Sequence, residues 1–569
     1  MVLIISMKAS KVLWESLERE GIKFVFGVPG PDIEEFLDSL MDTPQLRWVR
    51  FRHEEGAAFA ACAASRVLGY KPVALLVSSG SGAMRCLNGM GGAYYDCWPV
   101  VMITASSDDS RQADVFLAVS KMNTRIKDSN EVSDVIHKSV TAAISHPPGP
   151  VYIEMPIEVQ SKEAKMKQYT SAEVIRPMGH PKDVKKAVEL LLKAERPLIL
   201  AGGAAIISNA SDEVQELAEL LVAPVITTVT GRYTLSDDHH LAFGLGGFPM
   251  GMLGSKVAIK LSQEADVLIA LGVRFTELTT SQWSDPGKTK IIQINIDPVE
   301  LGRNYPVTVG ILGDVKLSLQ EINKALRLKL SRDYRSSARF KELMKLKEEH
   351  QASLKPQLEA SDVPIHPARL INEIRKAFDK TSIATGEAGH VGNFAASFYR
   401  GYHPNAFIRM GWFSSMAFAL SSAIGVKLAA PDRQVVAICG DGGFMMNCQE
   451  LETAKREGLG IVCVIFNNSI LAAIKITQLM AFKRYYASEF TNPDYIKFAE
   501  AFGCYGIRAE KPDELPSALS KAIKVADEGV PVVVDVPIGV PTPPRTGRWL
   551  YPGFHDDSIA SGYLYTYRK

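Results

Sequence analysis

The chain carries almost no surplus charge of either sign. Its 569 residues include 64 lysines and arginines and 63 aspartates and glutamates, which leaves a net charge of +1. Proteins bind nucleic acids and anionic membrane surfaces through concentrated positive charge. The composition therefore predicts no nucleic-acid or membrane partner and favours small molecules or other proteins as ligands.

Cysteine is scarce, and the few cysteines are scattered. No two of them have the short spacing of a zinc finger or a redox motif. Cys439 and Cys463 stand in apolar runs, where cysteine acts as a small hydrophobic residue. These observations predict a reduced protein of the cytoplasm. The seven cysteines are Cys62, Cys86, Cys97, Cys439, Cys448, Cys463 and Cys504.

Long hydrophobic runs are lacking. No run reaches the ~20 residues of a membrane-spanning helix, and the apolar start, Met1–Met7, is too short for a signal peptide. No G-x-G-x-x-G pattern follows an expected strand, which argues against a nicotinamide dehydrogenase.

The chain is too long for one hydrophobic core. In three successive blocks, short β-branched apolar runs alternate with helix-like segments, which predicts an α/β fold of three doubly wound parallel-sheet domains. We place these domains at residues 1–160, 183–329 and 365–541, followed by a tail at 542–569. The polar segments Lys162–Pro181 and Ser331–Glu359 are expected to be a linker and an exposed connection.

Two short motifs in the third block suggest a metal site. Gly440-Asp441-Gly442 and, after 24 intervening residues, Asn467-Asn468 each follow an apolar run that reads as a buried strand. The segment Phe444–Gly458 between them has the length of one helix, so both motifs end strands of one βαβ unit. Open α/β sheets bind ligands at that edge. A carboxylate and an amide oxygen beside a glycine turn suit Mg²⁺ holding a diphosphate.

A second constellation lies near the N-terminus. Phe26-Gly27-Val28-Pro29-Gly30 is followed by His53 and Glu54, and Glu54 opens an alanine-rich helix expected to pack closely on its neighbours. Taken alone, Glu54 fits a carboxylate that interacts with the dipole of its own helix.

These motifs, together with Gly411–Leu420, resemble those of thiamine-diphosphate-dependent enzymes of the acetolactate synthase and 2-keto acid decarboxylase superfamily. The resemblance covers roughly residues 8–541, with the motifs in the family's order. It implies pyrimidine-binding, middle and diphosphate-binding domains for the three blocks.

The resemblance assigns the site residues by position. It implies Mg²⁺ ligands at Asp441, Asn468 and the backbone carbonyl of Ile470. Met416 matches the residue that props the cofactor in its bent form, and Ser414 the residue whose carbonyl accepts the 4′-amino group. The cofactor-binding set implied in this way is Glu54, Gly389, His390, Val391, Ser414, Met416, Gly440, Asp441, Gly442, Gly443, Asn468, Ile470, Leu471 and Ala472.

Glu54 matches the family's catalytic glutamate, which bonds the cofactor's pyrimidine and makes removal of the thiazolium proton intramolecular. The resemblance then implies decarboxylation of a 2-keto acid through a cofactor-bound carbanion or enamine. In such enzymes the positions of Glu54 and Asp441 come from different subunits, which implies at least a homodimer, with a homotetramer expected.

Three segments depart from acetolactate synthases and leave the substrate open. Pro31-Asp32 replaces a small pair, and Asp32 reads either as an acid or base or, slightly better, as the N-cap of a helix Ile33–Leu40. Thr104–Ser120 lacks the family's Phe-Gln pair, for which Arg111, Gln112 and Phe116 are weak substitutes. Lys475 and Gln478 read equally as substrate residues or as solvated helix residues.

The middle block carries segments similar to flavin contacts of acetolactate synthases, namely Gly251–Gly254, Leu271–Phe275, Asp297 and Gly313–Val315. Glycines after strands are also ordinary turn residues. FAD is therefore one reading of this block, and a structural rather than a redox role would follow.

The motifs and the resemblance together predict a thiamine-diphosphate- and Mg²⁺-dependent decarboxylase or carboligase of 2-keto acids, with pyruvate as the expected donor. Two alternatives remain. One is a lyase of the oxalyl-CoA decarboxylase or 2-hydroxyacyl-CoA lyase type, which acts on an acyl substrate. The other is an inactive cofactor-binding homologue, against which the intact Glu54, Asp441 and Asn468 argue.

Overall fold

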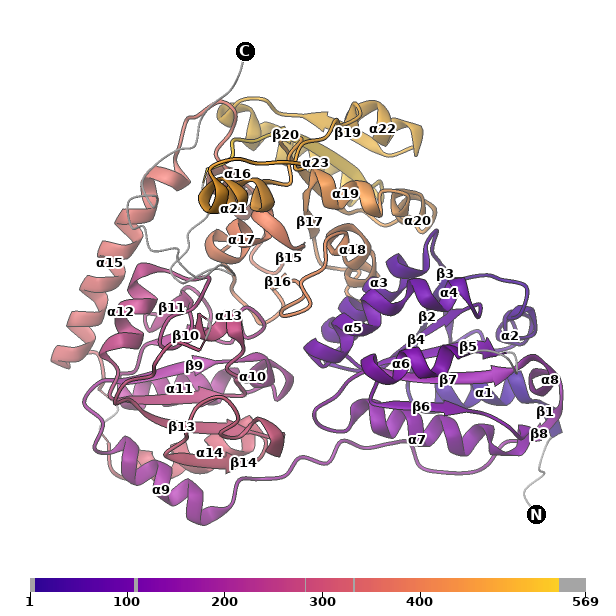
Figure 1. Cartoon of the computed structure of the whole chain (residues 1–569), viewed down its shortest axis with the longest axis horizontal. Coiled ribbons are helices and arrows are strands. Elements are labelled where there is room, and N and C mark those ends of the chain that lie inside the picture. The colour runs from indigo at the N-terminus through magenta and orange to yellow at the C-terminus, as the bar shows by residue number, and fades with distance from the viewer. Residues whose placement is uncertain (1–5, 107–110, 282, 331–332, 542–569) are drawn as a thin grey trace.

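Three six-stranded parallel sheets, each flanked by helices, make up the protein (Figure 1). The computed structural model describes residues 6–106, 111–281, 283–330 and 333–541. This arrangement confirms the predicted α/β class. The tail expected at 542–569 lies outside the described residues.

The first sheet has the order β3-β2-β4-β5-β7-β6. Its four central strands are mostly apolar and buried because helices cover both faces, which is typical of parallel sheets, whereas the edge strands β3 and β6 are more polar. The strands are β2 (Phe24–Val28), β3 (Arg47–Arg50), β4 (Val73–Val77), β5 (Val100–Ser106), β6 (Met122–Arg125) and β7 (Val151–Pro156). The helices are α1 (Ala9–Arg19), α2 (Glu34–Leu40), α3 (Glu54–Val67), α4 (Ser81–Arg85), α5 (Leu87–Asp96), α6 (Gln112–Phe116), α7 (Val132–Ile144) and α8 (Ile157–Gln160).

The polar segment after the first sheet is only partly irregular. It begins with β8 (Glu163–Lys165), which pairs antiparallel with β1 (Ser6–Lys8). From Met166 to the start of α9 at Pro181 the chain forms no helix or strand, as a linker should.

The middle sheet has the order β11-β10-β9-β12-β13-β14. Its strands are β9 (Pro197–Ala201), β10 (Val225–Thr227), β11 (Ala242–Leu245), β12 (Val267–Leu271), β13 (Lys290–Asn295) and β14 (Val309–Leu312). Its helices are α9 (Pro181–Leu191), α10 (Gly203–Ile207), α11 (Ser211–Leu221), α12 (Lys256–Glu264), α13 (Glu277–Thr280) and α14 (Val315–Arg327). The connection that follows is α15 (Ala338–Leu358), a charged helix along the edge of the molecule of which only Leu343 is buried (Figure 1).

The third sheet has the order β16-β15-β17-β18-β20-β19. Its strands are β15 (Ile383–Gly386), β16 (Phe407–Ile408), β17 (Val435–Gly440), β18 (Val462–Asn467), β19 (Tyr505–Arg508) and β20 (Val532–Pro537). Its helices are α16 (Pro367–Ala377), α17 (Gly389–Phe398), α18 (Phe418–Ala429), α19 (Asp441–Met446), α20 (Glu450–Arg456), α21 (Ala472–Phe482), α22 (Tyr495–Ala501) and α23 (Leu515–Asp527).

The connection between the two motif strands is not the single helix expected over Phe444–Gly458. It consists of two short helices, α19 and α20, separated at Asn447–Gln449. Asn447 leaves the helical conformation (φ −134°, ψ 26°), and its side chain donates to Glu55 of the first domain, 3.1 Å away. The break therefore turns polar groups of this connection toward α3, which periodicity alone does not reveal.

Helix α3 joins the first and third domains. It lies against α5 on one side and α18 on the other (Figure 1). A Cβ added to Gly425 would stand 2.1 Å from the carbonyl oxygen of Ala60, and one added to Gly89 would stand 2.4 Å from the Cβ of Ala58. Such close approaches need glycine and alanine. The predicted tight packing of α3 is thus confirmed, and one apolar core spans both domains.

Candidate active site

Asp441 is the buried centre of a ring of N–H donors. It follows β17 as the first residue of α19 and is 3% exposed. Its Oδ1 accepts from the backbone N–H of Gly442 at 2.9 Å. Its Oδ2 accepts from the backbone N–H groups of Asn468 and Ser469 at 2.8 and 2.5 Å. The ends of β17 and β18 therefore converge on one carboxylate, as the sequence predicts.

A further residue of this cluster, Asn492, was missed in the sequence. Its side-chain N–H donates to Oδ2 of Asp441 at 2.8 Å and to the side-chain oxygen of Asn467 at 2.9 Å. Its own oxygen is buried without a hydrogen-bond partner. Asn492 lies far along the chain in a segment without periodicity, so no sequence signal marks it.

Gly442 forms a cradle beneath three side chains. A Cβ at this position would stand 3.2 Å from Leu471, 3.4 Å from Phe490 and 3.6 Å from Met416. The predicted cofactor residues Met416 and Leu471 thus lie together beside the glycine turn. Ala472 starts α21 directly behind them and is buried.

Glu387 ties the glycine turn to the two other predicted loops. Its Oε1 accepts from the backbone N–H of Gly440 at 2.5 Å, and its Oε2 accepts from the backbone N–H of Ala417 at 2.7 Å. A Cβ on Gly443 would overlap the same carboxylate. Glu387 has no signal in the sequence, because a lone glutamate after a strand belongs to no motif.

The loop that follows Glu387 approaches the turn as well. Gly389 begins α17 in the left-handed conformation (φ +84°), and the side chain of Val391 lies 3.3 Å from a Cβ built on Gly440. His390 is buried and its Nε2 lies 2.7 Å from the carbonyl oxygen of Pro541. The predicted residues 389–391 are thus brought to the site.

The segment around Ser414 has an unusual backbone. Ser414 and Ala417 have φ values of +44° and +66°, in a region that L-residues rarely adopt. Ser414 is held by Arg409, whose guanidinium donates to its Oγ at 3.0 Å, and Ser415 accepts from the N–H of Ala388 at 3.1 Å. Strain of this kind persists where the surroundings fix it and is enriched at functional sites.

Burial of Glu387 raises the pKa of its carboxyl to about 8, despite the two N–H donors that favour the charged form. The ordinary value is 4.5, so between these values the folded protein keeps a proton that the unfolded chain loses. This group therefore stabilises the fold below about pH 4.5, and its contribution is lost as the pH rises to about 8.

Glu387→Gln should remove this pH dependence. Relative to the wild type, we expect the variant without cofactor to gain stability by roughly 2–5 kcal/mol as the pH is raised from about 5 to about 8. Urea unfolding of both proteins across this range measures the difference. Parallel stability curves would contradict the pKa.

Glu54 opens α3 and is nearly buried, at 6% exposed. Its two carboxylate oxygens lie 3.4 and 3.3 Å from Nη1 of Arg85, a half-exposed residue of the same domain. A Cβ on Gly82 would stand 3.3 Å from its Oε1. Arg85 was not predicted. Its ion pair with Glu54 contributes little stability because water screens the arginine.

Asp32 is not the N-cap of the helix that follows it. Helix α2 begins at Glu34, and Ile33 occupies the cap position without a side-chain bond. The carboxylate of Asp32 turns instead to the end of β4, where its Oδ2 accepts from the backbone N–H and the hydroxyl of Ser79 at 2.8 and 2.5 Å. These two bonds outweigh a single capping bond. Asp32 and the exposed Pro31 remain predicted substrate residues.

The suggested substitutes for the Phe-Gln pair face their own domain. Gln112 is buried, accepts from the N–H of Gly80 at 2.5 Å and donates to the hydroxyl of Tyr152. Phe116 stacks on the Tyr152 ring at 4.4 Å. Both side chains pack within the first domain, whereas Arg111 is a highly exposed surface residue.

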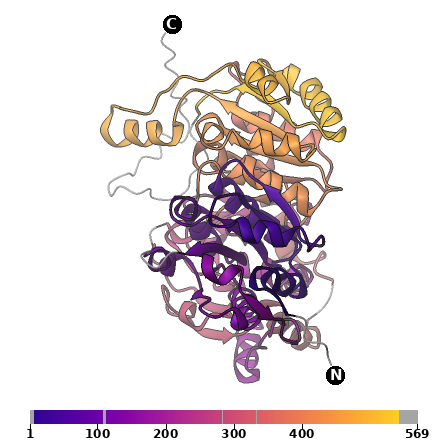
Figure 2. The ribbon, with the colours of Figure 1, turned by 90° about the vertical axis from the view of Figure 1, so that its right-hand side faces the viewer.

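Lys475 and Gln478 lie on α21, which stands out from the body of the molecule (Figure 2). The Nζ of Lys475 lies 2.6 Å from Glu489 and over the ring of Tyr485, and Gln478 accepts from the N–H of Tyr486. Both bind the segment that follows the helix, and their predicted contact with substrate stays a prediction.

The flavin-like segments of the middle domain have structural partners. Asp297 accepts from the N–H of Val299, and Asp314 caps α14 by accepting from the N–H of Leu317. Gly202 approaches the carbonyl of Gly272 so closely that a Cβ would stand 2.3 Å from it. Turns and caps account for these residues without a ligand.

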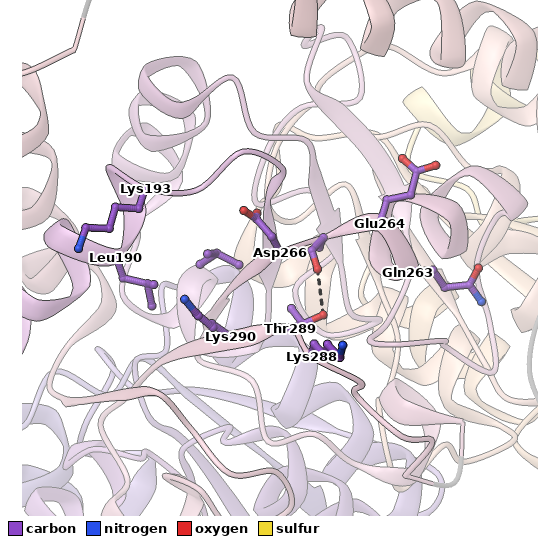
Figure 3. Close-up of a pocket in the computed structure, with 10 residues that line it drawn as sticks. Leu190, Lys193, Gln263, Glu264, Asp266, Lys288, Thr289 and Lys290 are labelled. Atoms are coloured by element: carbon purple, nitrogen blue, oxygen red, sulfur yellow. Dashed lines mark hydrogen bonds between the residues drawn. The ribbon is translucent and has the colours of Figure 1, made fainter.

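A surface cavity of about 330 Å³ lies in the middle domain, between Lys193, Asp266 and Lys290 (Figure 3). It opens at the start of β12 and β13, whereas open α/β sheets bind ligands at the opposite, carboxyl ends. Asp266 is already bonded to the N–H groups of Glu195 and Arg196. This cavity is therefore not the candidate site.

The donors near Asp441 fit a magnesium ion and a diphosphate. Asp441, Asn468 and the carbonyl of Ile470 offer only oxygen, which Mg²⁺ prefers, and a Cβ on Gly442 would press on Leu471 at 3.2 Å, so the turn beside them favours glycine. In the described part of the chain, no three His, Cys, Asp or Glu side chains gather as a metal site.

Among the same described residues, no helix is long and apolar enough to span a membrane.

Comparison with known proteins agrees with this geometry. Three family models match the chain in order: the N-terminal TPP binding domain (residues 7–128), the central domain (184–322) and the C-terminal TPP binding domain (387–536) of thiamine pyrophosphate enzymes.

Curated relatives match nearly the whole chain. A probable acetolactate synthase large subunit of Methanococcus aeolicus is 34% identical and covers 91% of this chain and 90% of its own length. One of Methanocaldococcus jannaschii is also 34% identical, with 95% and 94% covered. A putative thiamine pyrophosphate-containing protein of Bacillus subtilis is 30% identical, with 95% and 93% covered.

Proposed function

The chain belongs to the thiamine pyrophosphate enzyme family, as an acetolactate-synthase-like enzyme that forms or cleaves carbon–carbon bonds. From this premise we propose that it is a thiamine-diphosphate- and Mg²⁺-dependent decarboxylase and carboligase of 2-keto acids, with pyruvate as donor. The observation that carries the proposal is the convergence of Asp441, the Asn468 turn and Met416 on one glycine cradle.

Asp441, Asn468 and the carbonyl of Ile470 would hold the metal, and the turn at Gly442–Gly443 would receive the diphosphate. When bound, thiamine diphosphate supplies the nucleophilic carbon and the electron sink for decarboxylation. Met416, beside the cradle, would support the bent cofactor. The N–H groups around Asp441 keep its carboxylate aimed in one direction.

Glu54 would hold a proton at the pyrimidine ring. Its near burial suits a carboxyl that must exchange a proton with the cofactor rather than with water. Arg85, which is half-exposed, lies 3.3 Å from the same carboxylate.

We infer a homodimer, and by resemblance a homotetramer. The side-chain bonds of Glu54 stay within its own domain. The stacked rings of Tyr95 and Phe413, 38% exposed each, and neighbouring Trp412 leave apolar surface beside α5, which suits a subunit contact. Sedimentation of the purified protein tests the assembly.

The proposal does not require FAD. The flavin reading of the middle domain rests on resemblance, and an absorption spectrum of the purified protein is its direct measurement. The cytoplasmic location likewise stays a prediction from the cysteine pattern.

Release of CO₂ from pyruvate should depend on both thiamine diphosphate and Mg²⁺. Protein stripped by a chelator and dialysis should lose nearly all activity and regain it only when both are returned, because Asp441 would hold the metal on which retention of the cofactor's diphosphate would depend. Activity that survives stripping would contradict the proposal.

A panel of 2-keto acids and acyl-CoA compounds, with the products identified by NMR, separates the possible reactions. Acetolactate from pyruvate indicates a synthase, and a free aldehyde indicates a decarboxylase. Turnover of acyl-CoA compounds alone would favour a lyase of the oxalyl-CoA decarboxylase or 2-hydroxyacyl-CoA lyase type. Absence of any turnover by cofactor-loaded protein would favour an inactive homologue.

A further inference from the structure

The turn before α3 is held by a carboxylate of another domain. Glu450, the first residue of α20, is fully buried. Its Oε1 accepts from the backbone N–H of His53 at 3.0 Å, and its Oε2 accepts from that of Arg52 at 3.3 Å. These N–H groups directly precede Glu54. The diphosphate-binding domain therefore fixes the backbone that carries the proposed catalytic carboxyl of the first domain.

The fit around Glu450 leaves it little freedom. The hydroxyl of Thr453 donates to its Oε2 at 2.6 Å. On the side of α3 a Cβ built on Gly56 would stand 2.7 Å from Oε1 and 3.0 Å from the carboxyl carbon. Only glycine at this position lets the carboxylate reach the backbone of the turn.

A second bridge runs parallel to the first. Glu55 accepts from the side-chain N–H of Asn447 at 3.1 Å and from that of Asn88 at 2.6 Å, and Asn88 in turn lies 2.6 Å from the hydroxyl of Ser415. Residues on both sides of Glu54 are thus tied to the segments that form the glycine cradle.

We propose that Glu450 is a positioning residue for Glu54, acting through the backbone N–H groups of Arg52 and His53. The inference rests on the proposed function, because it takes Glu54 to contact the cofactor. Glu450 is fully buried, with its carboxylate bonded to protein donors, so it would not contact cofactor or substrate itself. It sets the direction in which Glu54 leaves the start of α3.

The expected size of the effect follows from geometry. Misplacing a catalytic group by ~1 Å costs about a hundredfold in rate, and the turn at Arg52–His53 has two N–H groups whose direction depends on this carboxylate. Three donors bond Glu450: the backbone N–H groups of Arg52 and His53 and the hydroxyl of Thr453. Burial raises the pKa of its carboxyl to about 7. Glutamine, a neutral amide of the same size, would keep one acceptor oxygen and turn its N–H₂ toward one of these donors.

Glu450→Gln should therefore lower kcat by about 10- to 100-fold while KM and the cofactor's Kd change by less than about threefold. Exchange of the bound cofactor's C2 proton, followed by NMR after acid quench, should slow by a similar factor. In the cofactor-free protein, amide hydrogen exchange over residues 48–56 should become faster.

Two further variants separate positioning from general stability. Glu457→Gln removes the charge from the 2.9 Å contact between Glu457 and Arg47, which joins the same two domains away from α3. It should leave kcat, C2 exchange and amide hydrogen exchange unchanged. Gly56→Ala presses on Glu450 from the opposite side and should reproduce its effects. The double variant with Glu450→Gln should then show less than the sum of the two free-energy changes.

Unchanged C2 exchange and unchanged amide protection in Glu450→Gln would overturn the inference, as would full additivity with Gly56→Ala. If Glu450→Gln fails to fold, Gly56→Ala alone decides by the same measurements. Failure of the proposed function looks different: Glu54→Gln itself would then leave C2 exchange intact.

Discussion

Glu54→Gln is expected to lower the rate of pyruvate decarboxylation by about 10²- to 10⁴-fold, the range that a positioned proton-transferring group contributes. Glutamine keeps the shape and hydrogen bonds but has no proton to exchange with the pyrimidine. Cofactor binding should persist, because the metal and diphosphate contacts lie around Asp441. The measurement is CO₂ release from cofactor-loaded protein, with cofactor affinity determined in parallel.

Glu34→Gln is the matched control. Glu34 is the first residue of α2 just as Glu54 is the first residue of α3, but its side chain is exposed. If a glutamate at a helix start served only the helix dipole, both variants would lose at most ~1 kcal/mol of stability and no activity. Equal, small effects of the two variants would therefore refute the catalytic role of Glu54.

Asp441→Asn should nearly abolish retention of the cofactor. Asparagine lacks the single negative charge that this ligand set offers to Mg²⁺, and its N–H₂ would face N–H groups of Asn468 or Gly442, which now donate to the carboxylate. Loss of an outer-shell partner of a metal costs about 10- to 100-fold in affinity, and loss of a direct ligand should exceed that. Calorimetric titration with thiamine diphosphate and Mg²⁺ measures the change.

Thermal unfolding with and without cofactor gives a second test of the role of Asp441. Thiamine diphosphate with Mg²⁺ should raise the melting temperature of the wild type by mass action, and should leave that of Asp441→Asn nearly unchanged. Asp432→Asn, an exposed aspartate in the loop before β17, should behave as the wild type. A cofactor-dependent shift retained in Asp441→Asn would exclude Asp441 as a metal ligand.

Local periodicity was a good guide to the sheets and a poor guide to the connections. The apolar runs that end at Gly440 and Asn467 form neighbouring parallel strands, because a strand buried on both faces must be apolar throughout. The segment between them has helical propensity along its length, yet it breaks at Asn447. There the bonds to Glu55 of another domain decide the backbone, and periodicity contains no record of them.

Asp32 illustrates the same limit at a single residue. An aspartate before an amphipathic run is favoured as an N-cap, and nothing in the neighbouring sequence argues otherwise. The end of β4 brings Ser79 within reach, and its N–H and hydroxyl compete successfully for the carboxylate.

The sequence by itself determined the class of the domains and the ends of the strands that carry Asp441 and Asn468, because burial on both faces makes each of these strands a continuous apolar run. It also placed Glu54 at the start of its helix. Only the tertiary structure decided which distant groups hold these residues. Glu387, Asn492 and Glu450 act across turns or domains, and a contact between residues far apart in the chain leaves no local pattern by which to find it.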